Sequence, residues 1–124
     1  MVLMTGKGGN YAQSRTTEIY NPRTKTSCSL PQLPEDRYYH SQDGDLACGG
    51  GRYGSSTATT CVKWNPVSGT WNQSHTFKHK RHGLVSWETA SGVYLIGGDT
   101  SRTSEKVKLD GSVEEGFGLK YYTR

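Results

Sequence analysis

The chain has no long hydrophobic run. Its longest apolar stretch, Val93–Ile96, falls far short of the roughly 18 residues that a membrane helix needs, so membrane insertion is not expected. Apolar residues make up only 31% of the 124 residues, and the mean hydropathy is −0.77. They do not recur at the three-and-four spacing of an amphipathic helix, which disfavours a helical bundle.

Cysteine is also scarce, with three residues at Cys28, Cys48 and Cys61. No two have the two-residue spacing of a zinc knuckle, and no histidine lies near them as a second ligand, so a metal site is not expected. Three cysteines allow one disulfide and one odd thiol. Cys48 ends one predicted strand and Cys61 lies on the next, so a hairpin would bring them within bonding distance. Three buried free thiols are an equally good interpretation.

The compartment is indicated by two short features. The sequon Asn72-Gln-Ser74 fits an exposed glycosylation site, and a disulfide fits an oxidising environment, so the two together favour a secreted protein. No basic and apolar leader precedes the predicted strand Val2–Thr5. We therefore expect either an intracellular, cytoplasmic chain or a piece of a longer chain whose start lies upstream.

What the chain does contain is a repeat at an offset of 44 residues. Its 16 glycines and its short runs of Val, Ile, Tyr and Trp, bounded by Gly, Pro, Asn and Asp, are typical of strands and turns. A fixed period of this length marks repeat architectures. The matching segments are Val2–Asn10 with Leu46–Gly54, Ile19–Pro22 with Lys63–Pro66, and Arg37 with Arg81, and a third copy opens at Val93–Gly98.

The central copy predicts the plan of one unit. Its expected strands cover 45–48, 59–64, 70–77 and 83–87, with a turn at Asn65–Gly69 between the second and the third. Each unit is thus expected to be a four-stranded antiparallel meander. The unit boundaries are 1–45, 46–92 and 93–124, and the third unit is expected to end before its fourth strand. The predicted fold is all-β, with about two and a half units.

The repeated residues resemble the kelch repeat. Family blades carry a double glycine after an apolar strand, an aromatic residue before a turn, a later tryptophan and an arginine before the last strand. The matching positions here are Gly6 in the weaker pair Thr5–Gly6, Gly49 and Gly50, Gly97 and Gly98, Tyr20 and Trp64 with Leu109 as a weaker third match, Trp71, Arg37 and Arg81.

The resemblance implies a β-propeller of about six blades around a central channel. This chain would supply fewer than three of them. The remaining blades are expected from the same longer chain, which we favour, or from other copies. The segments that begin at Cys28 and Cys48 are similar to those of secreted kelch propellers.

The resemblance also implies a non-enzymatic binding or scaffold module whose blade loops recognise a protein or a glycan. The loops are expected at 7–15, 52–57, 79–82 and 99–104. Their candidate binding residues are Arg52, Tyr53, Lys78, His79, Lys80, His82 and Arg102. The basic run 78–82 lacks the interleaved aromatic residues of a stacking platform, so a nucleic-acid partner is not expected.

Two other functions remain open. Some secreted kelch-type propellers are similar to galactose oxidase, a copper enzyme, and its ligands would have to come from Tyr38, Tyr39 and His40, or from His75, His79 and His82. The sequence shows no carboxylate pair, no nucleophile with a base and no phosphate-binding loop, so neither an enzyme nor a cofactor is expected. The other alternative is an intracellular substrate adaptor of the kelch type.

Several anchors are expected to be structural. Trp64, Trp71 and Trp87 are predicted to pack between neighbouring units rather than to bind a ligand. Arg37 and Arg81 are predicted to bind backbone carbonyls near the turns with their guanidinium groups.

Overall fold

The protein is all-β. The computed structural model describes residues 2–5, 15–51, 58–98 and 103–116, and among these no helix is long and apolar enough to span a membrane. Short runs of β-branched and aromatic residues between turns form the strands. They are β1 (Val2–Thr5), β2 (Thr17–Asn21), β3 (Thr26–Leu30), β4 (Ser41–Asp43), β5 (Leu46–Cys48), β6 (Thr60–Asn65), β7 (Thr70–Thr76), β8 (Val85–Thr89), β9 (Gly92–Ile96), β10 (Ser104–Lys108) and β11 (Val113–Glu115).

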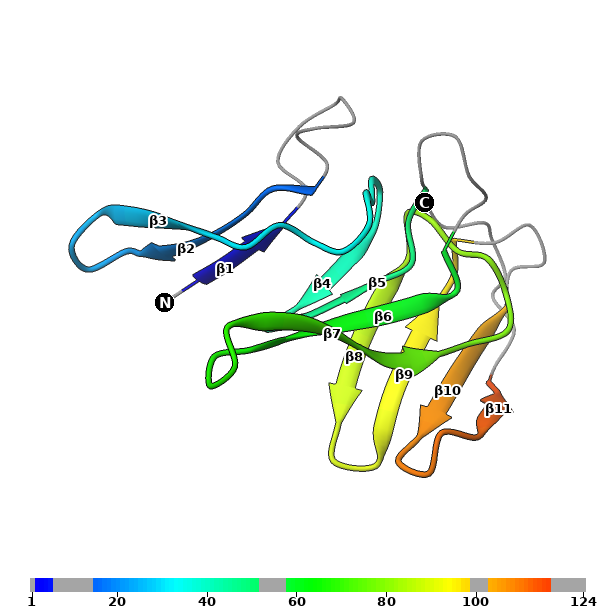
Figure 1. The fold of residues 1–124 in the computed structure, drawn as a ribbon. Helices are drawn as coiled ribbons and strands as arrows, with labels where there is room; N and C mark the ends of the chain where they lie inside the picture. Colours follow the sequence, from blue (N-terminus) through cyan, green and yellow to red (C-terminus); the bar gives the residue numbers. More distant parts are fainter. Residues whose placement is uncertain (1, 6–14, 52–57, 99–102, 117–124) are drawn as a thin grey trace.

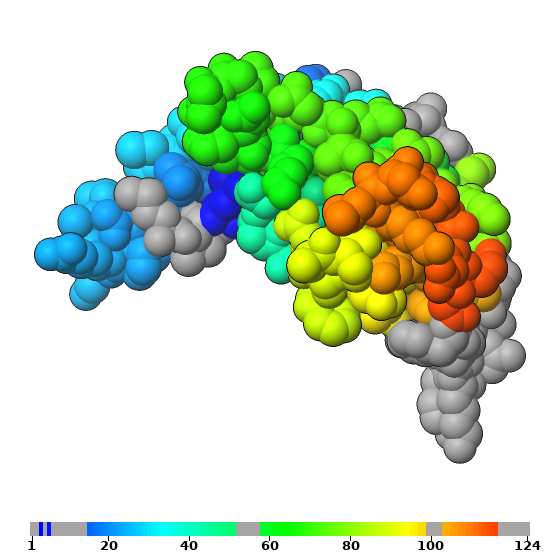
Figure 2. All heavy atoms as spheres, turned by 90° about the horizontal axis from the view of Figure 1, so that it is seen from below, coloured from blue at the N-terminus to red at the C-terminus, as the bar shows by residue number. Residues whose placement is uncertain are grey.

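The strands form three antiparallel sheets that follow one another along the chain. The first sheet has the order β1-β2-β3, the second β4-β5-β6-β7, and the third β8-β9-β10-β11. The three sheets succeed each other along an arc (Figure 1, Figure 2). The hollow side of this arc carries β1, β4 and β8, and the three sheets therefore present the same end of their strand order to it.

The strand predicted at 83–87 belongs to a different sheet from the one expected. We expected it to be the fourth strand of the central unit, but β8 pairs with β9, with Val85 opposite Ile96. The two-residue turn Ala90–Ser91 makes β8 and β9 neighbours, whereas a linker of eight residues separates β7 from β8. The third sheet therefore has four strands, and the three-stranded sheet is the first one.

The 44-residue repeat recurs in the hydrogen bonds of the turns. Asn65 O accepts a hydrogen bond from Gly69 N at 2.8 Å, and Asn21 O accepts one from Lys25 N at 2.8 Å. Each asparagine also accepts, through Oδ1, a hydrogen bond from the backbone N–H two residues later, at 2.9 and 3.0 Å. Lys25 has a φ of 58° where Gly69 has 68°. The two turns are thus built in the same way, although the first one lacks the glycine.

The match between the first two copies shifts by one residue in β1. Leu3 pairs with Ile19, as Leu46 pairs with Lys63. Leu3, and not Val2 as the sequence match suggested, therefore takes the place of Leu46. Backbone pairing decides this register, and a single-residue slip is invisible in so short a motif.

Each pair of neighbouring sheets encloses its own hydrophobic core. The core between the first and second sheets contains Leu33, Ala47, Val62 and Trp71, with Leu3 and Trp64 packed against it. The core between the second and third sheets contains Leu46, Cys48, Cys61, Phe77, Leu84, Val93, Leu95 and Val107, with Val113 packed against it. Leu33 and Phe77, which are 44 residues apart, come soon after the last strands of the first and second sheets in the chain, and both are buried.

Polar side chains of β4 join all three sheets on the hollow side. Gln42 donates through Nε2 to Leu3 O and accepts through Oε1 from Thr5 N at 3.1 Å. Asp43 Oδ2 accepts a hydrogen bond from Glu88 N at 2.7 Å. The second sheet thus binds the backbone of both of its neighbours.

Candidate functional site

Of the predicted binding loops, 79–82 is described in full, and it lies at the end of the sheets where the glycine-rich strand ends meet the linkers. Gly50 N donates to Arg81 O at 2.7 Å, and His82 N donates to Gly98 O at 3.0 Å. Gly51 and Tyr38 exchange two backbone hydrogen bonds in the same way. The bonds of Arg81 and His82 fix the backbone of the described linker that carries the candidate binding residues Lys78, His79, Lys80 and His82. We call this end of the molecule the glycine rim.

Glycine is required at the rim because the linkers pass too close for a side chain. Gly49 has a φ of +66°, and a Cβ atom there would lie 2.7 Å from Arg81 O. Gly98 has a φ of +75°, and its Cβ atom would lie 2.7 Å from His82 O. Both the backbone conformation and the space exclude an L side chain. The double glycines at 49–50 and 97–98 therefore have a structural cause.

Arg37 and Arg81 are buried and bind backbone carbonyls, as the sequence predicts. Each guanidinium binds the glycine after one strand and the threonine at the start of the next. That threonine is the first residue of β6 for Arg37 and directly precedes β10 for Arg81. Arg37 donates to Gly49 O at 2.9 Å, Thr60 O at 2.9 Å and Thr60 Oγ1 at 2.8 Å, and Arg81 donates to Gly97 O at 2.8 Å, Thr103 O at 2.7 Å and Thr103 Oγ1 at 2.9 Å.

Arg81 has a further partner that the sequence analysis missed. Glu105 is fully buried, and its Oε1 accepts a hydrogen bond from Arg81 Nε at 3.0 Å. The same carboxylate accepts the backbone N–H of Lys78 at 2.9 Å and of His79 at 3.2 Å. Glu105 therefore fixes the basic linker through two backbone N–H groups and the Arg81 side chain. The available signal was its place on the buried face of β10, two residues before buried Val107.

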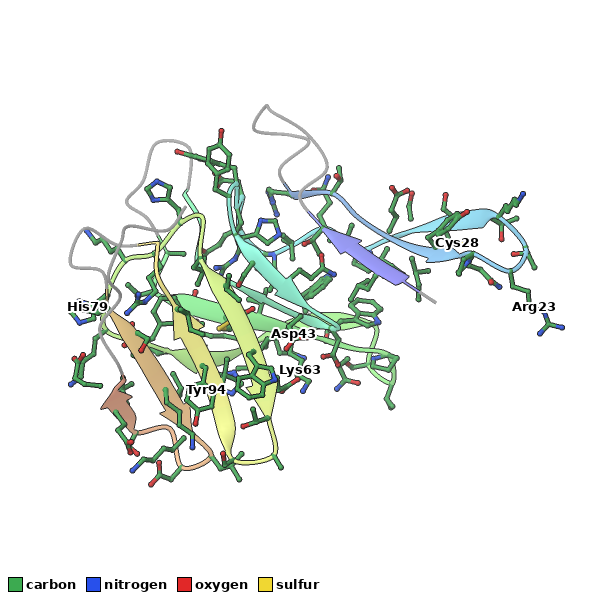
Figure 3. All side chains as sticks on the ribbon, turned by 180° about the vertical axis from the view of Figure 1, so that it is seen from behind. Arg23, Cys28, Asp43, Lys63, His79 and Tyr94 are labelled. Atoms are coloured by element: carbon green, nitrogen blue, oxygen red, sulfur yellow. A yellow bond between two sulfur atoms is a disulfide. The ribbon has the colours of Figure 1, made fainter. Side chains whose placement is uncertain are left out.

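The side chains of the basic linker differ in exposure. Lys78 and Lys80 are exposed, whereas His79 and His82 are half-buried. His79 Nε2 lies 3.5 Å from Glu115 Oε1 at the outer side of the third sheet (Figure 3). Lys78 and Lys80 are therefore the candidate binding residues that the described rim offers to a ligand. Arg52, Tyr53, Arg102 and the anchor Gly6 lie outside the described residues.

The rung that closes each sheet next to the rim has a different chemistry in each sheet. In the second sheet it is the Cys48–Cys61 disulfide, with both cysteines fully buried, which confirms the proposed pairing. Cys28 is exposed on the β2–β3 hairpin, away from this bond (Figure 3). The corresponding rungs pair Thr5 with Thr17 in the first sheet and Ile96 with Ser104 in the third.

His40 lies in the linker between the first and second sheets. Its Nε2 is 2.6 Å from Thr5 Oγ1. Burial and the nearby charge of Arg37 lower its pKa to about 4, although the Arg37 backbone opposes part of this shift. Leu84 stands at the same place 44 residues later, beside Gly98 as His40 is beside Gly50. The imidazole is therefore neutral at neutral pH and fills a position that is apolar in the next copy.

The three tryptophans lie in different surroundings. Trp71 is 7% exposed in the first core, and Trp64 packs on it with ring centroids 5.5 Å apart, as expected for packing between sheets. Trp87 is 58% exposed and stacks on Tyr94 at 5.4 Å. It lies on the face of the third sheet that points away from the second, and no described residue of a further sheet covers it. Lys106 Nζ lies 5.2 Å from the Tyr94 ring centroid on the same face.

The remaining anchors and the sequon lie at the surface. Asn72 is exposed on β7, an edge strand, and its amide donates to Thr70 Oγ1 at 3.1 Å. Tyr20 is half-buried, and Leu109 is 78% exposed in the turn after β10. Leu109 thus does not pack as Trp64 does, because it lies in the turn after β10, whereas Trp64 lies within β6.

The residues considered for copper do not converge. Within 2–5, 15–51, 58–98 and 103–116, no three His, Cys, Asp or Glu side chains are grouped closely enough to hold a metal ion. His75 Nδ1 lies 2.8 Å from Ser74 Oγ, and burial lowers its pKa. The rings of Tyr38 and Tyr39 contact each other edge to face, with centroids 5.6 Å apart. No protein-family model and no curated protein matches this chain.

Proposed function

We propose that this chain is a non-enzymatic binding module made of kelch-type propeller blades, whose rim loops recognise a protein or a glycan. The observation that carries the proposal is the repeated arginine anchor. Arg37 and Arg81, 44 residues apart, each bind a strand-end glycine and the threonine of the returning strand. A module built this way holds its loops on a fixed scaffold, where recognition commonly resides.

The arrangement of the sheets supports the propeller. Strand order runs from the hollow side outward in the same sense in all three sheets, as in blades around a channel. The open face at Trp87 corresponds to the face of the second sheet that the third sheet covers. A further blade, from the same longer chain or from another copy, would cover it in a closed ring.

The buried Cys48–Cys61 disulfide favours a secreted protein over the intracellular adaptor. Disulfides persist in oxidising compartments, whereas cytosolic thiols are kept reduced. Mass spectrometry of the natural protein under non-reducing conditions tests this part of the proposal. Three free thiols would favour the adaptor.

Hydroxyl-radical footprinting of the natural protein tests ring closure. In a closed ring, Trp87 is covered and should be oxidised as slowly as Trp71, which is 7% exposed. Leu109, 78% exposed, is the internal reference for an accessible side chain. Fast oxidation of Trp87 would contradict the closed ring.

Charge removal at the rim tests the binding surface. We expect a variant with Lys78→Ala and Lys80→Ala to lose binding to a panel of neutral and sulfated glycans and of secreted proteins, measured by surface plasmon resonance. The matched control removes two exposed cations elsewhere, by Arg23→Ala and Lys108→Ala, and should bind as the natural protein does. Equal binding by both variants would contradict a binding role for the basic linker.

A further inference from the structure

A cleft of about 680 Å³ opens between the first and second sheets. Its lining residues are Leu3, Ile19, Gln42, Gly44, Asp45, Trp64 and Pro66. This volume lies in the range of ligand-binding pockets. The cleft lies beside the turns at Gly44–Asp45 and Asn65–Gly69, at the end of the sheets opposite the glycine rim. It is therefore separate from the loops of the proposed function.

The cleft exists because two charged side chains are missing from the first interface. Between the second and third sheets, Lys63 Nζ binds Glu88 Oε2 at 3.0 Å, and Figure 3 shows Lys63 at this junction. The residues 44 positions earlier are Ile19 and Gly44. Isoleucine is shorter than lysine and uncharged, and glycine has no side chain. The space that the ion pair fills in the second interface therefore stays open in the first.

Among the described residues that line the cleft, the charged group available to a ligand is the Asp45 carboxylate. The Gln42 amide already binds Leu3 O, Thr5 and Gly44 O. The Asp45 side chain is 43% exposed, and its charged contact among the described residues is Lys63 Nζ at 3.9 Å, beyond hydrogen-bond distance. The other walls are aliphatic or aromatic. A sugar needs several polar partners, and the described lining offers few.

We propose that this cleft binds a lysine or arginine side chain of a partner polypeptide. The aliphatic stem lies along Ile19 and Trp64, and the cationic head meets the Asp45 carboxylate and the face of the indole. Lys63 already shows that a lysine stem with a carboxylate at its end fits this position in the neighbouring interface. The proposal depends on two described sheets and requires neither a closed ring nor the rim loops.

Titration with short peptides tests the site. The probes are acetyl-Gly-Lys-Gly-amide and acetyl-Gly-Arg-Gly-amide, added to the isotope-labelled full chain, with the Trp64 indole N–H followed by NMR. We expect saturable shifts at Trp64 and at the Asp45 amide. The uncharged norleucine peptide should bind at least about tenfold more weakly, because it lacks the cation that pairs with Asp45. Equal binding of the norleucine peptide, or no saturable shift, would overturn the proposal.

Two variants locate the interaction. Asp45→Asn should weaken lysine-peptide binding about tenfold, because it removes the carboxylate and keeps the shape. Ile19→Lys supplies the cation within the chain and should block the peptide while the protein stays folded. Glu114→Gln removes an exposed negative charge from the third sheet and is the matched control. Binding unchanged by Asp45→Asn in a protein with a native spectrum would refute the site, whatever the rim variants show.

Discussion

The two sheet interfaces share one backbone plan and fill it with different side chains. Between the second and third sheets, a buried Arg81–Glu105 pair and a surface Lys63–Glu88 pair flank a hydrophobic core. Between the first and second sheets, Arg37 has its carbonyl bonds, but Val62 stands where pairing places Glu105. The anchor that both interfaces keep is thus the arginine, and the charged pairs are additions to the second interface.

The difference teaches which contacts the repeat needs. The carbonyl bonds of the arginine and the glycine contacts recur, so they maintain the backbone of each linker. Side chains at the other interface positions vary between charge and aliphatic packing. The first interface holds a cleft of about 680 Å³, whereas the pocket between β7 and β10 in the second measures about 280 Å³.

Replacing Glu105 should have the largest effect. Glu105→Val copies Val62 into the second interface and leaves Arg81 buried without its carboxylate and the linker N–H groups without an acceptor. We expect a loss of about 3–5 kcal/mol in the free energy of unfolding, measured by urea denaturation. Glu114→Gln, at an exposed carboxylate, should change it by less than about 0.5 kcal/mol. A loss below about 1 kcal/mol for Glu105→Val would mean that the pair is dispensable.

Removing the disulfide should come next. Cys48→Thr with Cys61→Thr copies the rung of the first sheet into the second. We expect the free energy of unfolding to fall by about 2–4 kcal/mol, because the bond closes a loop in the unfolded chain and so restricts the conformations of that chain. Cys28→Ser is the control and should leave the melting temperature unchanged. If the double variant and the natural protein have the same melting temperature, the bond does not stabilise the fold by constraining the unfolded chain.

His40 should make the first interface sensitive to acid. Its folded pKa of about 4 lies below the ordinary 6.5, so the unfolded chain binds a proton first as the pH falls. Its contribution to stability is complete above about pH 6.5 and is lost between there and about pH 4, amounting to at most about 3 kcal/mol.

His40→Leu, which copies Leu84, should remove this part of the pH dependence. Urea denaturation of both proteins from about pH 8 to about pH 4 measures the difference, since the carboxylates titrate equally in both. Parallel curves for the two proteins would show that His40 is not buried as described.

The surface pair should matter least. In the natural protein, the hydrogen bond to Glu88 raises the pKa of Lys63. Lys63→Ile copies Ile19 into this position and removes that bond. Because Lys63 is well exposed, we expect Lys63→Ile to lower the free energy of unfolding by less than about 1 kcal/mol. The difference from the natural protein should be smaller in high salt. Thermal unfolding at two salt concentrations measures it. A larger, salt-independent loss would indicate packing of the lysine stem instead.

Local chemistry was predictable from the sequence. The turn at Asn65, the strand-and-turn content and the place of Cys48 opposite Cys61 depend on residues close in the chain. The arginine anchors were also predictable, because glycine-rich strand ends leave carbonyls that a guanidinium can bind.

Contacts between sheets were not predictable in the same way. Nothing in the residues 83–87 states whether that strand turns back to its own sheet or crosses to the next. From the sequence, Glu105 is predicted only to lie on a strand. Its pairing with Arg81 becomes evident only when the fold brings the two side chains together. The cleft arises from what Ile19 and Gly44 lack, and a missing side chain leaves a mark only when the two sheets are brought together.

The side chains of Gln42 and Asp43 also affect how the protein meets other molecules. β1 and β8 each end a sheet, and an unpaired strand edge is a template on which another chain can add a strand. Gln42 binds Leu3 O and Thr5 N, and Asp43 binds Glu88 N, so these three backbone groups already have partners within the chain. One short strand thus occupies part of the backbone edge of each neighbour, which disfavours strand addition there.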